Sequence, residues 1–329
     1  MQSNPEKPII SVIVPYYQEE TGILSKAIES ALQQTNIDHI DLEIFIIDDE
    51  SPIPAQKELP QSILDMKNIH IIKQNNTGPA GARNKGLNTV PNQTRYIAFL
   101  DSDDCWEPNH LSQAWKALEA GYDFYFSDFY QLEQSVSAFN RAKRINITEH
   151  PLLFEKNSSL HQYVGNMTEQ IVTGNIIGTS TVVYRYQNNI NLRFREDLIR
   201  AGEDYLFWLS LTTNTDKIAF SSHCECVYGK GINVYSGTQY GTTEYLELVY
   251  YEIKYKKIIL DEFNLNSELK NKLRNHISKQ QENFVLSYLS QLKKRKTHLS
   301  LAIKFIQISP TAFFLTPYYI LKRVTVQRQ

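Results

Sequence analysis

Short apolar runs alternate with helical patterns through the first 120 residues of the chain. Four runs are expected to be buried strands: Ile9–Val14, Glu43–Ile47, Ile69–Ile72 and Tyr96–Leu100. Between them, apolar side chains at helical spacing indicate helices over residues 21–34, behind a Thr21 cap, over 80–89 and over 109–120. Because strands that alternate with helices form parallel sheets, the sequence predicts an α/β fold with a mostly parallel, doubly wound sheet.

Three carboxylates follow the fourth expected strand. Asp101, Asp103 and Asp104 lie within four residues, in the sequence YIAFLDSDD. The carboxyl ends of the strands in such a sheet line one crevice, where three acids repel one another unless a cation or hydrogen-bond donors offset their charge. Mg²⁺ and Mn²⁺ prefer carboxylate oxygens, so a metal site is predicted here. The simpler alternative is a solvated acidic turn that caps the helix after Pro108.

Polar residues also end the first two expected strands. Asp48 and Asp49 follow the second strand, where a carboxylate accepts a hydrogen bond from a pyrimidine imide or, alternatively, closes a turn in Asp-Asp-Glu-Ser-Pro. Tyr16 and Tyr17 follow the first strand and compete for the role of a ring that stacks on a base, or serve only in packing. Since these segments meet at one edge of the predicted sheet, they indicate one binding site.

The segment Asn76–Gly86, NTGPAGARNKG, combines glycines with Arg83 and Asn84. The guanidinium of Arg83 suits either a phosphate or the bracing of an acidic cluster. The segment has no Gly-Lys-Ser/Thr, and the first strand lacks the Gly-x-Gly-x-x-Gly turn. A phosphate-loop protein and a dinucleotide-binding fold are therefore not expected.

Two acids, Glu203 and Asp204, begin an expected helix over Glu203–Leu211. Acids in a first turn suit the helix dipole, which explains them without any chemistry. The functional interpretation is that Asp204 is a general base, which takes a proton from an attacking hydroxyl.

The order VIVPYY, IIDDES, NTGPAGARNKG, FLDSDD and GEDYLFW resembles glycosyltransferase family 2, the inverting enzymes of GT-A fold, over roughly residues 8–212. The resemblance implies that Asp204 is the catalytic base. It also implies that Asp103 holds Mn²⁺ or Mg²⁺ and that Asp104 holds this metal or the donor sugar. The implied nucleotide site comprises Pro15, Tyr17, Asp49, Arg83, Asp101 and Ser102, with Arg83 on the nucleotide or supporting Asp49. Supporting roles are expected for Glu19, Asp48, Asn84 and Glu203.

Two positions depart from the family pattern. Glu50 stands where the family usually has a glycine. Many relatives supply a histidine metal ligand after the catalytic acid; the candidate is His223, for which a structural or surface role is the expectation. The glycine-rich segment Gly229–Gly241 is expected to be a mobile loop over the donor.

Charge divides the chain unevenly. Residues 1–243 carry 19 Lys and Arg against 29 Asp and Glu, whereas residues 244–329 carry 15 against 7. The basic residues Lys293–Lys296 precede apolar stretches that Pro310 and Pro317 interrupt, which suggests an anchor at an anionic membrane surface. The alternative is a helical lid with a solvated basic face. Nucleic acid is not an expected partner, because the body is acidic.

The three cysteines show neither zinc spacing nor a disulfide framework, which fits a reducing cytosol. No signal peptide or membrane-spanning run is evident. We expect three regions: 1–120, the nucleotide-sugar half of the GT-A domain; 121–242, the acceptor half with the base; and 243–329, a basic helical extension.

These features predict a peripheral enzyme on the cytoplasmic face of the inner membrane. It would transfer a sugar from a nucleotide diphosphate, expected to be UDP, to a hydroxyl of a lipid-linked glycan in surface polysaccharide synthesis. Two alternatives are a catalytically degenerate donor-binding or scaffold protein and a nucleotidyltransferase. Asp103, Asp104 and Asp204 argue against the first, and the absence of a basic Gly-rich loop after the first strand argues against the second.

Overall fold

The computed structural model describes residues 7–131, 134–154, 158–213, 215–230, 238–295 and 298–326. The chain forms two compact units. The first comprises Met1–Glu196 and Phe207–Gly231, and the second comprises Asp197–Leu206 and Ile232–Gln329.

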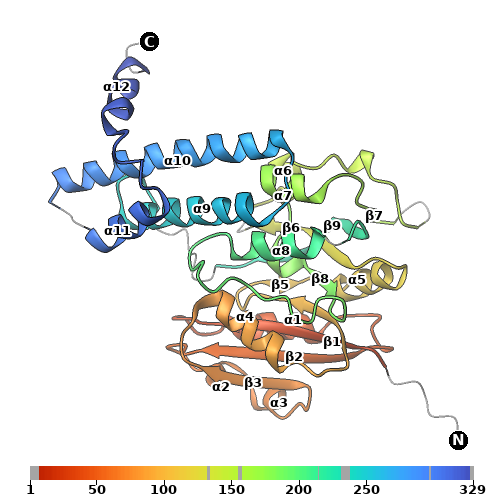
Figure 1. Ribbon diagram of the computed structural model, residues 1–329. Helices are drawn as coiled ribbons and strands as arrows, with labels where there is room; N and C mark the ends of the chain where they lie inside the picture. Colours follow the sequence, from red (N-terminus) through yellow and green to blue (C-terminus); the bar gives the residue numbers. More distant parts are fainter. Residues whose placement is uncertain are drawn as a thin grey trace, which may run out of the picture. The chain divides into compact units, whose positions relative to one another are not determined.

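The first unit is built on one sheet, which has nine strands in the described part of the chain (Figure 1). The strands are β1 (Ile9–Tyr16), β2 (Asp41–Asp49), β3 (Ile69–Gln74), β4 (Thr94–Phe99), β5 (Cys105–Trp106), β6 (Phe124–Gln131), β7 (Leu160–Gln162), β8 (Val183–Arg185) and β9 (Ile218–Tyr228). Their order is β3-β2-β1-β4-β8-β6-β9-β5, and β7 also pairs with β9.

The first four strands are parallel, as predicted, and β1 is central among them. Beyond β4 the sheet is mixed, because β8 runs antiparallel to both β4 and β6 while β6 and β9 are parallel. Because β1, β2 and β4 pair in parallel, their carboxyl ends lie at the same edge of the sheet, and Tyr16 lies opposite Asp48. The predicted convergence of these strand ends is therefore present.

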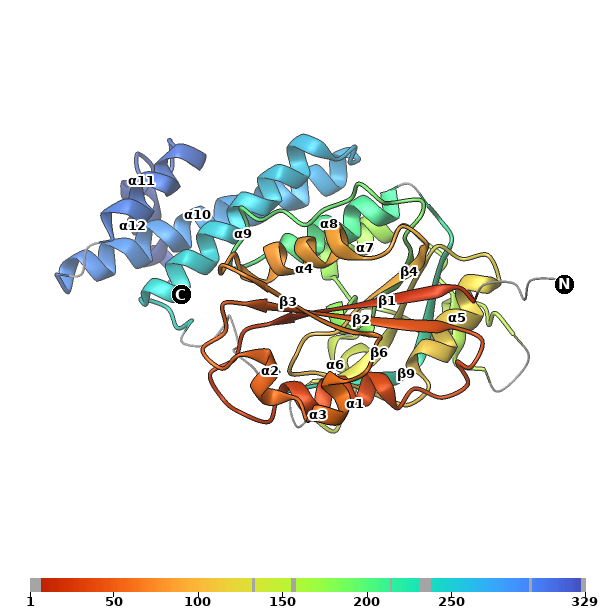
Figure 2. The same ribbon diagram turned by 90° about the horizontal axis from the view of Figure 1, so that it is seen from below.

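Eight helices of the described chain belong wholly or partly to the first unit. They are α1 (Leu24–Leu32), α2 (Ala55–Glu58), α3 (Gln61–Leu64), α4 (Gly78–Thr89), α5 (His110–Glu119), α6 (Ala138–Ala142), α7 (Met167–Gly174) and α8 (Glu203–Thr213). Figure 2 shows α4 on one face of the parallel strands and α1 and α3 on the other. The α1 stripe Leu24, Ala27, Ile28 and Ala31 is fully buried in the core, as its spacing predicts.

One local prediction was wrong. Helix α1 begins at Leu24, after Ile23, and Thr21 does not cap it; the preceding turn contains Gly22 at φ +80°, whose N–H donates to Glu58 at 2.6 Å.

A 3₁₀ turn, Thr179–Thr181, precedes β8. That turn places Ser180 where it bonds to the acidic segment after β4.

The second unit contains the helices of the C-terminal region, as predicted: α9 (Thr243–Glu262), α10 (Ser267–Lys293), α11 (Leu299–Ile308) and α12 (Thr316–Val326). Thr242 and Asn266 cap the first two by accepting from the N–H groups of Tyr245 and Leu269. Figure 1 shows α9 and α10 side by side. No helix in the described ranges combines the length and apolar character needed to cross a membrane.

Candidate active site

The acidic turn Asp101–Asp104 connects β4 to β5 at the carboxyl edge of the parallel strands. Its first member, Asp101, accepts a hydrogen bond from Arg83, with 2.6 Å between Oδ1 and Nη2. Arg83 is buried on α4, and its guanidinium carbon lies 5.4 Å from the centre of the Phe194 ring. Of the two interpretations of Arg83, this contact corresponds to the bracing of the acidic cluster, through Asp101.

Asp104 is held within the protein. The Ser180 hydroxyl donates to Oδ2 at 2.5 Å, and the Gly229 N–H donates to Oδ1 at 3.0 Å. Burial raises the pKa of Asp104 well above its usual value, and the charges of Asp101 and Asp103 raise it further. The turn therefore concentrates negative charge that a bound cation would offset.

Strand β9 brings Gly229 against this turn. A β-carbon at Gly229 would lie 1.7 Å from the carbonyl oxygen of Asp103, so only glycine permits this approach. Backbone pairing of β5 with β9, in which Cys105 faces Val227 and Trp106 faces Cys226, fixes the same alignment.

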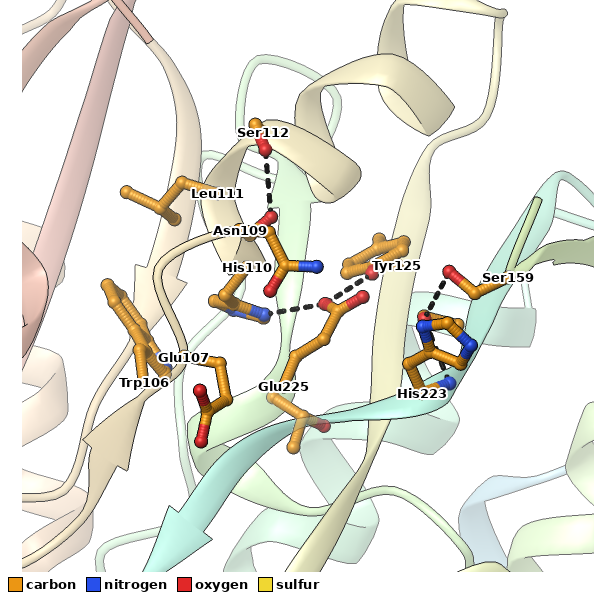
Figure 3. A network of polar contacts seen from close by, with 12 residues as sticks. Trp106, Glu107, Asn109, His110, Leu111, Ser112, Tyr125, Ser159, His223 and Glu225 are labelled. Carbon is orange, nitrogen blue, oxygen red and sulfur yellow. Dashed lines mark hydrogen bonds and ion pairs between the residues drawn. The ribbon is translucent and has the colours of Figure 1, made fainter. Parts of the chain in front are cut away.

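A buried polar network supports the β5–β9 pair (Figure 3). Glu225 of β9 is fully buried; Tyr125 donates to its Oε2 at 2.6 Å, and His110 Nδ1 lies 3.1 Å from the same oxygen. The Glu107 N–H donates to the Glu225 carbonyl at 2.9 Å. These bonds tie α5, β6 and β9 together just behind the acidic turn.

The two acids that end β2 accept hydrogen bonds from a turn and from the start of a helix. Asp48 accepts from the N–H groups of Ser51 and Ala55, each at 2.9 Å, which is the turn role considered from the sequence. Asp49 accepts from the N–H groups of Thr77 and Gly78 at 2.9 and 2.8 Å, and so fixes the start of α4. Both carboxylates are buried, and Asp49 lies at the edge where β1, β2 and β4 end.

Glu50 occupies the left-handed region, with φ +59°. A side chain there is less favourable than glycine, by roughly 1–2 kcal/mol for a non-glycine residue. Its carboxylate accepts from the Asn76 N–H at 3.1 Å, which partly offsets that strain.

The first strand ends in residues with distinct surroundings. Tyr16 is buried and donates to the Ile53 carbonyl, whereas Tyr17 is 37% exposed. Tyr17 is therefore the ring available for stacking on a ligand. Pro15 is half-buried in β1, and Glu19 is exposed beyond it.

Gln18, which the sequence did not single out, connects three strand ends. Its N–H donates to the Ser51 hydroxyl at 2.9 Å, and its side-chain amide donates to the hydroxyl of the predicted site residue Ser102 at 3.1 Å. Ser180 and Gly229 were also missed. A single buried glutamine or serine produces no periodic pattern in the sequence. Gly229 stood out only as the first residue of a glycine-rich segment.

Asn84 organises the chain after β8. Its amide donates to the Phe194 carbonyl and to Glu196, at 3.0 and 2.8 Å, and its oxygen accepts from the Phe194 N–H at 2.7 Å. Phe194 in turn stacks on Phe207, with 3.9 Å between ring centres. Asn84 thus anchors the chain around Phe194 and Glu196 to α4.

Glu203 and Asp204 begin α8, and both belong to the second unit. The Asp204 carboxylate accepts from the Tyr205 N–H at 2.8 Å. Gly202, at φ +93°, precedes them, and a β-carbon there would lie 2.3 Å from the Tyr255 ring of α9. Two ion pairs hold this segment on α9: Arg200–Glu247 at 2.8 Å and Lys254–Asp197 at 2.9 Å.

Two further expectations concern His223 and the glycine-rich segment Gly229–Gly241. His223 is exposed on β9, six residues before Gly229, which is about 20 Å along a strand. Its N–H donates to Ser221, which bonds to Ser159, and Figure 3 shows His223 on the Ser159 side. A structural or surface role therefore fits it. In the predicted loop Gly229–Gly241, residues 231–237 lie outside the described residues.

The donor set of the acidic turn fits a hard divalent cation, which takes carboxylate oxygens. Three carboxyl groups are close enough for Asp101 and Asp103 to raise the pKa of Asp104. Within the described ranges no group of three or more His, Cys, Asp or Glu side chains is arranged so that it could hold a metal ion by itself. The turn therefore offers carboxylate ligands, and oxygen atoms from elsewhere would complete the coordination.

A half-parallel α/β sheet with helices, followed by a helical region, is the architecture of GT-A proteins. Solved structures share it. The S. aureus TarS 1–349 structure in complex with UDP-GlcNAc superposes with a TM-score of 0.59 at 17% identity, over 94% of this chain and 91% of that one. The mannosyltransferase PcManGT from Pyrobaculum calidifontis in complex with GDP-Man and Mn²⁺ gives 0.56 at 13%, over 97% and 87%.

The chain belongs to glycosyl transferase family 2, whose model matches residues 11–206. It is also 30% identical over 246 residues to the succinoglycan biosynthesis protein ExoW of Rhizobium meliloti (strain 1021), over 72% of this chain and 74% of that protein. The family and the fold class predicted from the sequence are thereby confirmed.

Proposed function

We propose that the protein is an inverting glycosyltransferase that moves a sugar from a nucleoside diphosphate to a hydroxyl of a growing polysaccharide. The observation that carries the proposal is the acidic turn itself, which the fold presents at the edge where β1, β2 and β4 end. Membership of the family and similarity to a succinoglycan biosynthesis protein support the reaction class and the type of pathway.

The donor base is assigned to the edge between β1 and β2. Tyr17 offers an exposed ring for stacking, and Pro15 lies beside it. Asp49 lies at this edge as well, where its remaining acceptor capacity suits a pyrimidine N3–H. A UDP-sugar is therefore our proposed donor, and the UDP-GlcNAc complex of TarS supports that choice.

Asp101 and Ser102 are assigned to the ribose and diphosphate side, with Arg83 setting the orientation of Asp101. Asp103 and Asp104 would hold Mn²⁺ or Mg²⁺. Asp103 is the more exposed of the two, because its side chain is partly exposed whereas that of Asp104 is buried. Such an ion would neutralise charge on the departing diphosphate.

Asp204 is the proposed general base. Its carboxylate would take the proton of the acceptor hydroxyl while that oxygen attacks the anomeric carbon and the nucleoside diphosphate leaves from the opposite face. One displacement inverts the configuration and needs no covalent enzyme intermediate. Glu203 supports the base by adding negative charge at the same helix start.

The proposed acceptor is a lipid-linked glycan, with the protein acting peripherally at the cytoplasmic face of the membrane. The basic C-terminal region is the feature that suggests a membrane-borne acceptor.

The test is a calorimetric titration with UDP in the presence of Mn²⁺, repeated with EDTA. We expect binding that requires the metal and that Asp103→Asn weakens more than about tenfold. We also expect transfer from a UDP-sugar, which Asp204→Asn abolishes while UDP binding is kept. If UDP, dTDP and GDP all fail to bind the folded protein with metal present, the donor assignment is wrong.

A further inference from the structure

The end of the chain has a one-sided composition. Residues 283–329 contain no Asp or Glu and eight Lys and Arg. Nine of the twenty exposed large apolar side chains among the described residues also lie here, between Leu292 and Leu321. A surface that is both apolar and cationic is unusual for a helix facing only water.

Helix α11 has two apolar faces, of which the protein covers one. Leu301, Ala302 and Phe305 are buried, and the Phe305 ring stacks on Phe284 of α10 with 3.8 Å between centres. A second set, Leu299, Ile303 and Ile306, follows i, i+4, i+7 spacing and is exposed, with Leu299 at 68%. A helix that is apolar on both sides is expected to be buried on both.

The following segment repeats this division. Ala312 and Tyr319 are buried, and Phe313 packs edge-on against Tyr288 of α10 with 5.9 Å between centres. Phe314 is 85% exposed and Leu321 is 69% exposed. The inward side chains pack against the rest of the second unit and fix the segment, so the outward apolar side chains are exposed on an ordered surface.

Exposed cations accompany these side chains. Lys293, Lys294 and Arg295 are exposed at the end of α10, and Lys304 is exposed on α11 between Ile303 and Ile306. Long basic side chains beside apolar ones can extend to lipid phosphates while their stems stay in apolar surroundings. The charge of the surface therefore complements an anionic bilayer.

We propose that these outward residues form a membrane-docking surface for anionic phospholipid. Its members are Leu292–Arg295, Leu299, Ile303, Lys304, Ile306, Phe314, Leu315, Tyr318, Ile320 and Leu321. The apolar side chains lie among the headgroups and upper acyl chains, and the cations bind lipid phosphate. The inference rests on the proposed function in one respect: docking would bring the enzyme to the membrane that holds its lipid-linked acceptor.

The experiment is flotation of the full chain with vesicles of phosphatidylcholine alone and of phosphatidylcholine containing phosphatidylglycerol. We expect binding to the anionic vesicles that high salt weakens. The variant Lys293→Gln/Lys294→Gln/Arg295→Gln should bind them about 100-fold more weakly. The matched control Lys57→Gln/Lys67→Gln/Lys116→Gln removes three exposed charges from the first unit and should bind as the parent does.

A second pair of variants tests the apolar contribution. Phe314→Ser/Leu321→Ser should weaken vesicle binding by more than about tenfold. The control Val164→Ser/Ile190→Ser alters exposed apolar residues of the first unit and should not. Binding that is equal on neutral vesicles, or that survives both tail variants, overturns the proposal. So does a parent protein that ignores vesicles and instead self-associates through Phe314, as judged by ultracentrifugation.

UDP binding is measured on the same variants without vesicles, and we expect it to match the parent. If the parent binds vesicles but not UDP, the donor assignment fails while the docking surface stands. If it binds UDP but not vesicles, the docking surface fails alone.

Discussion

Arg83 and Asp101 form a partly buried ion pair, with 2.6 Å between Nη2 and Oδ1, that joins helix α4 to the acidic turn. The Arg83 side chain is almost fully buried and that of Asp101 is about a third exposed. The pair thus ties the segment after β3 to the end of β4, two places that the sequence separates by 18 residues.

Removing this pair should affect both stability and donor binding. Arg83→Met leaves Asp101 beside two other carboxylates, and we expect a loss of about 2 kcal/mol in the free energy of unfolding together with weaker UDP binding. Arg95→Met is the control, since its 2.7 Å pair with Glu119 is more exposed and should cost under about 1 kcal/mol. Urea unfolding and calorimetry measure the two effects; equal losses in both variants would contradict the assignment.

The two kinds of carboxylate should respond differently to amide substitution. Asp103→Asn is expected to weaken metal-dependent UDP binding more than about tenfold with little change in stability. Asp48→Asn keeps one of its two N–H partners and should cost about 1–2 kcal/mol of stability while UDP affinity changes little. Titrations of both variants with Mn²⁺ and with EDTA check this; a reversed pattern would place the metal at β2.

Gly229→Ala should disturb the acidic turn. The new methyl group cannot coexist with the Asp103 carbonyl, so β9 or the turn must move, at about 1–3 kcal/mol. Gly174→Ala is the comparison, because the flexible Arg144 side chain that it meets can shift. We expect donor binding to fall only for Gly229→Ala, as measured by UDP titration. Unchanged binding in a protein that keeps its melting temperature would refute the close approach.

The Glu225 network should be costly to break. Glu225→Leu leaves His110 and Tyr125 buried without their acceptor, and we expect a loss of about 3–5 kcal/mol in unfolding free energy. Glu225→Gln keeps an acceptor oxygen and should lose less. Glu119→Gln, near the surface, is the control in the same urea titrations. If Glu225→Leu leaves the free energy of unfolding unchanged, the network contributes nothing to the β5–β9 alignment.

Stability should depend on pH through Glu252 of α9. Burial raises the pKa of Glu252, but the hydrogen bond from His276, the Lys256 charge and the bond from Gln280 outweigh it, so the pKa lies below its usual value. Its contribution is complete above the unfolded pKa and is lost as pH falls through the folded one. Glu252→Gln should therefore be about 1 kcal/mol less stable at neutral pH, with no difference in strong acid.

Unfolding of both proteins across pH measures this contribution. A difference in unfolding free energy between the parent and Glu252→Gln that grows as the pH falls would contradict the lowered pKa of Glu252. Lys272→Gln, which breaks the exposed Lys272–Glu268 pair of α10, is the control and should show little effect at any pH.

The sequence by itself determined the parallel half of the sheet and the place of the acidic cluster. Those features are local: short apolar runs define β1, β2 and β4, and an acid that ends or directly follows a strand must lie at that strand's carboxyl end. The helical C-terminal region followed in the same way from composition and spacing. The family resemblance rested on these local motifs as well.

Only the tertiary structure decided what each polar side chain contacts. Asp48 and Asp49 look alike in the sequence, yet one closes a turn and the other caps α4. Ser180, Glu225 and Gly229 reach the turn or its support from strands or turns about 75 to 125 residues away. Such partners depend on strand order, and the order of β8, β6 and β9 is set by burial over the whole sheet. A hydrogen bond between distant segments leaves no periodic trace in the sequence, so its identity emerges only when the chain is folded.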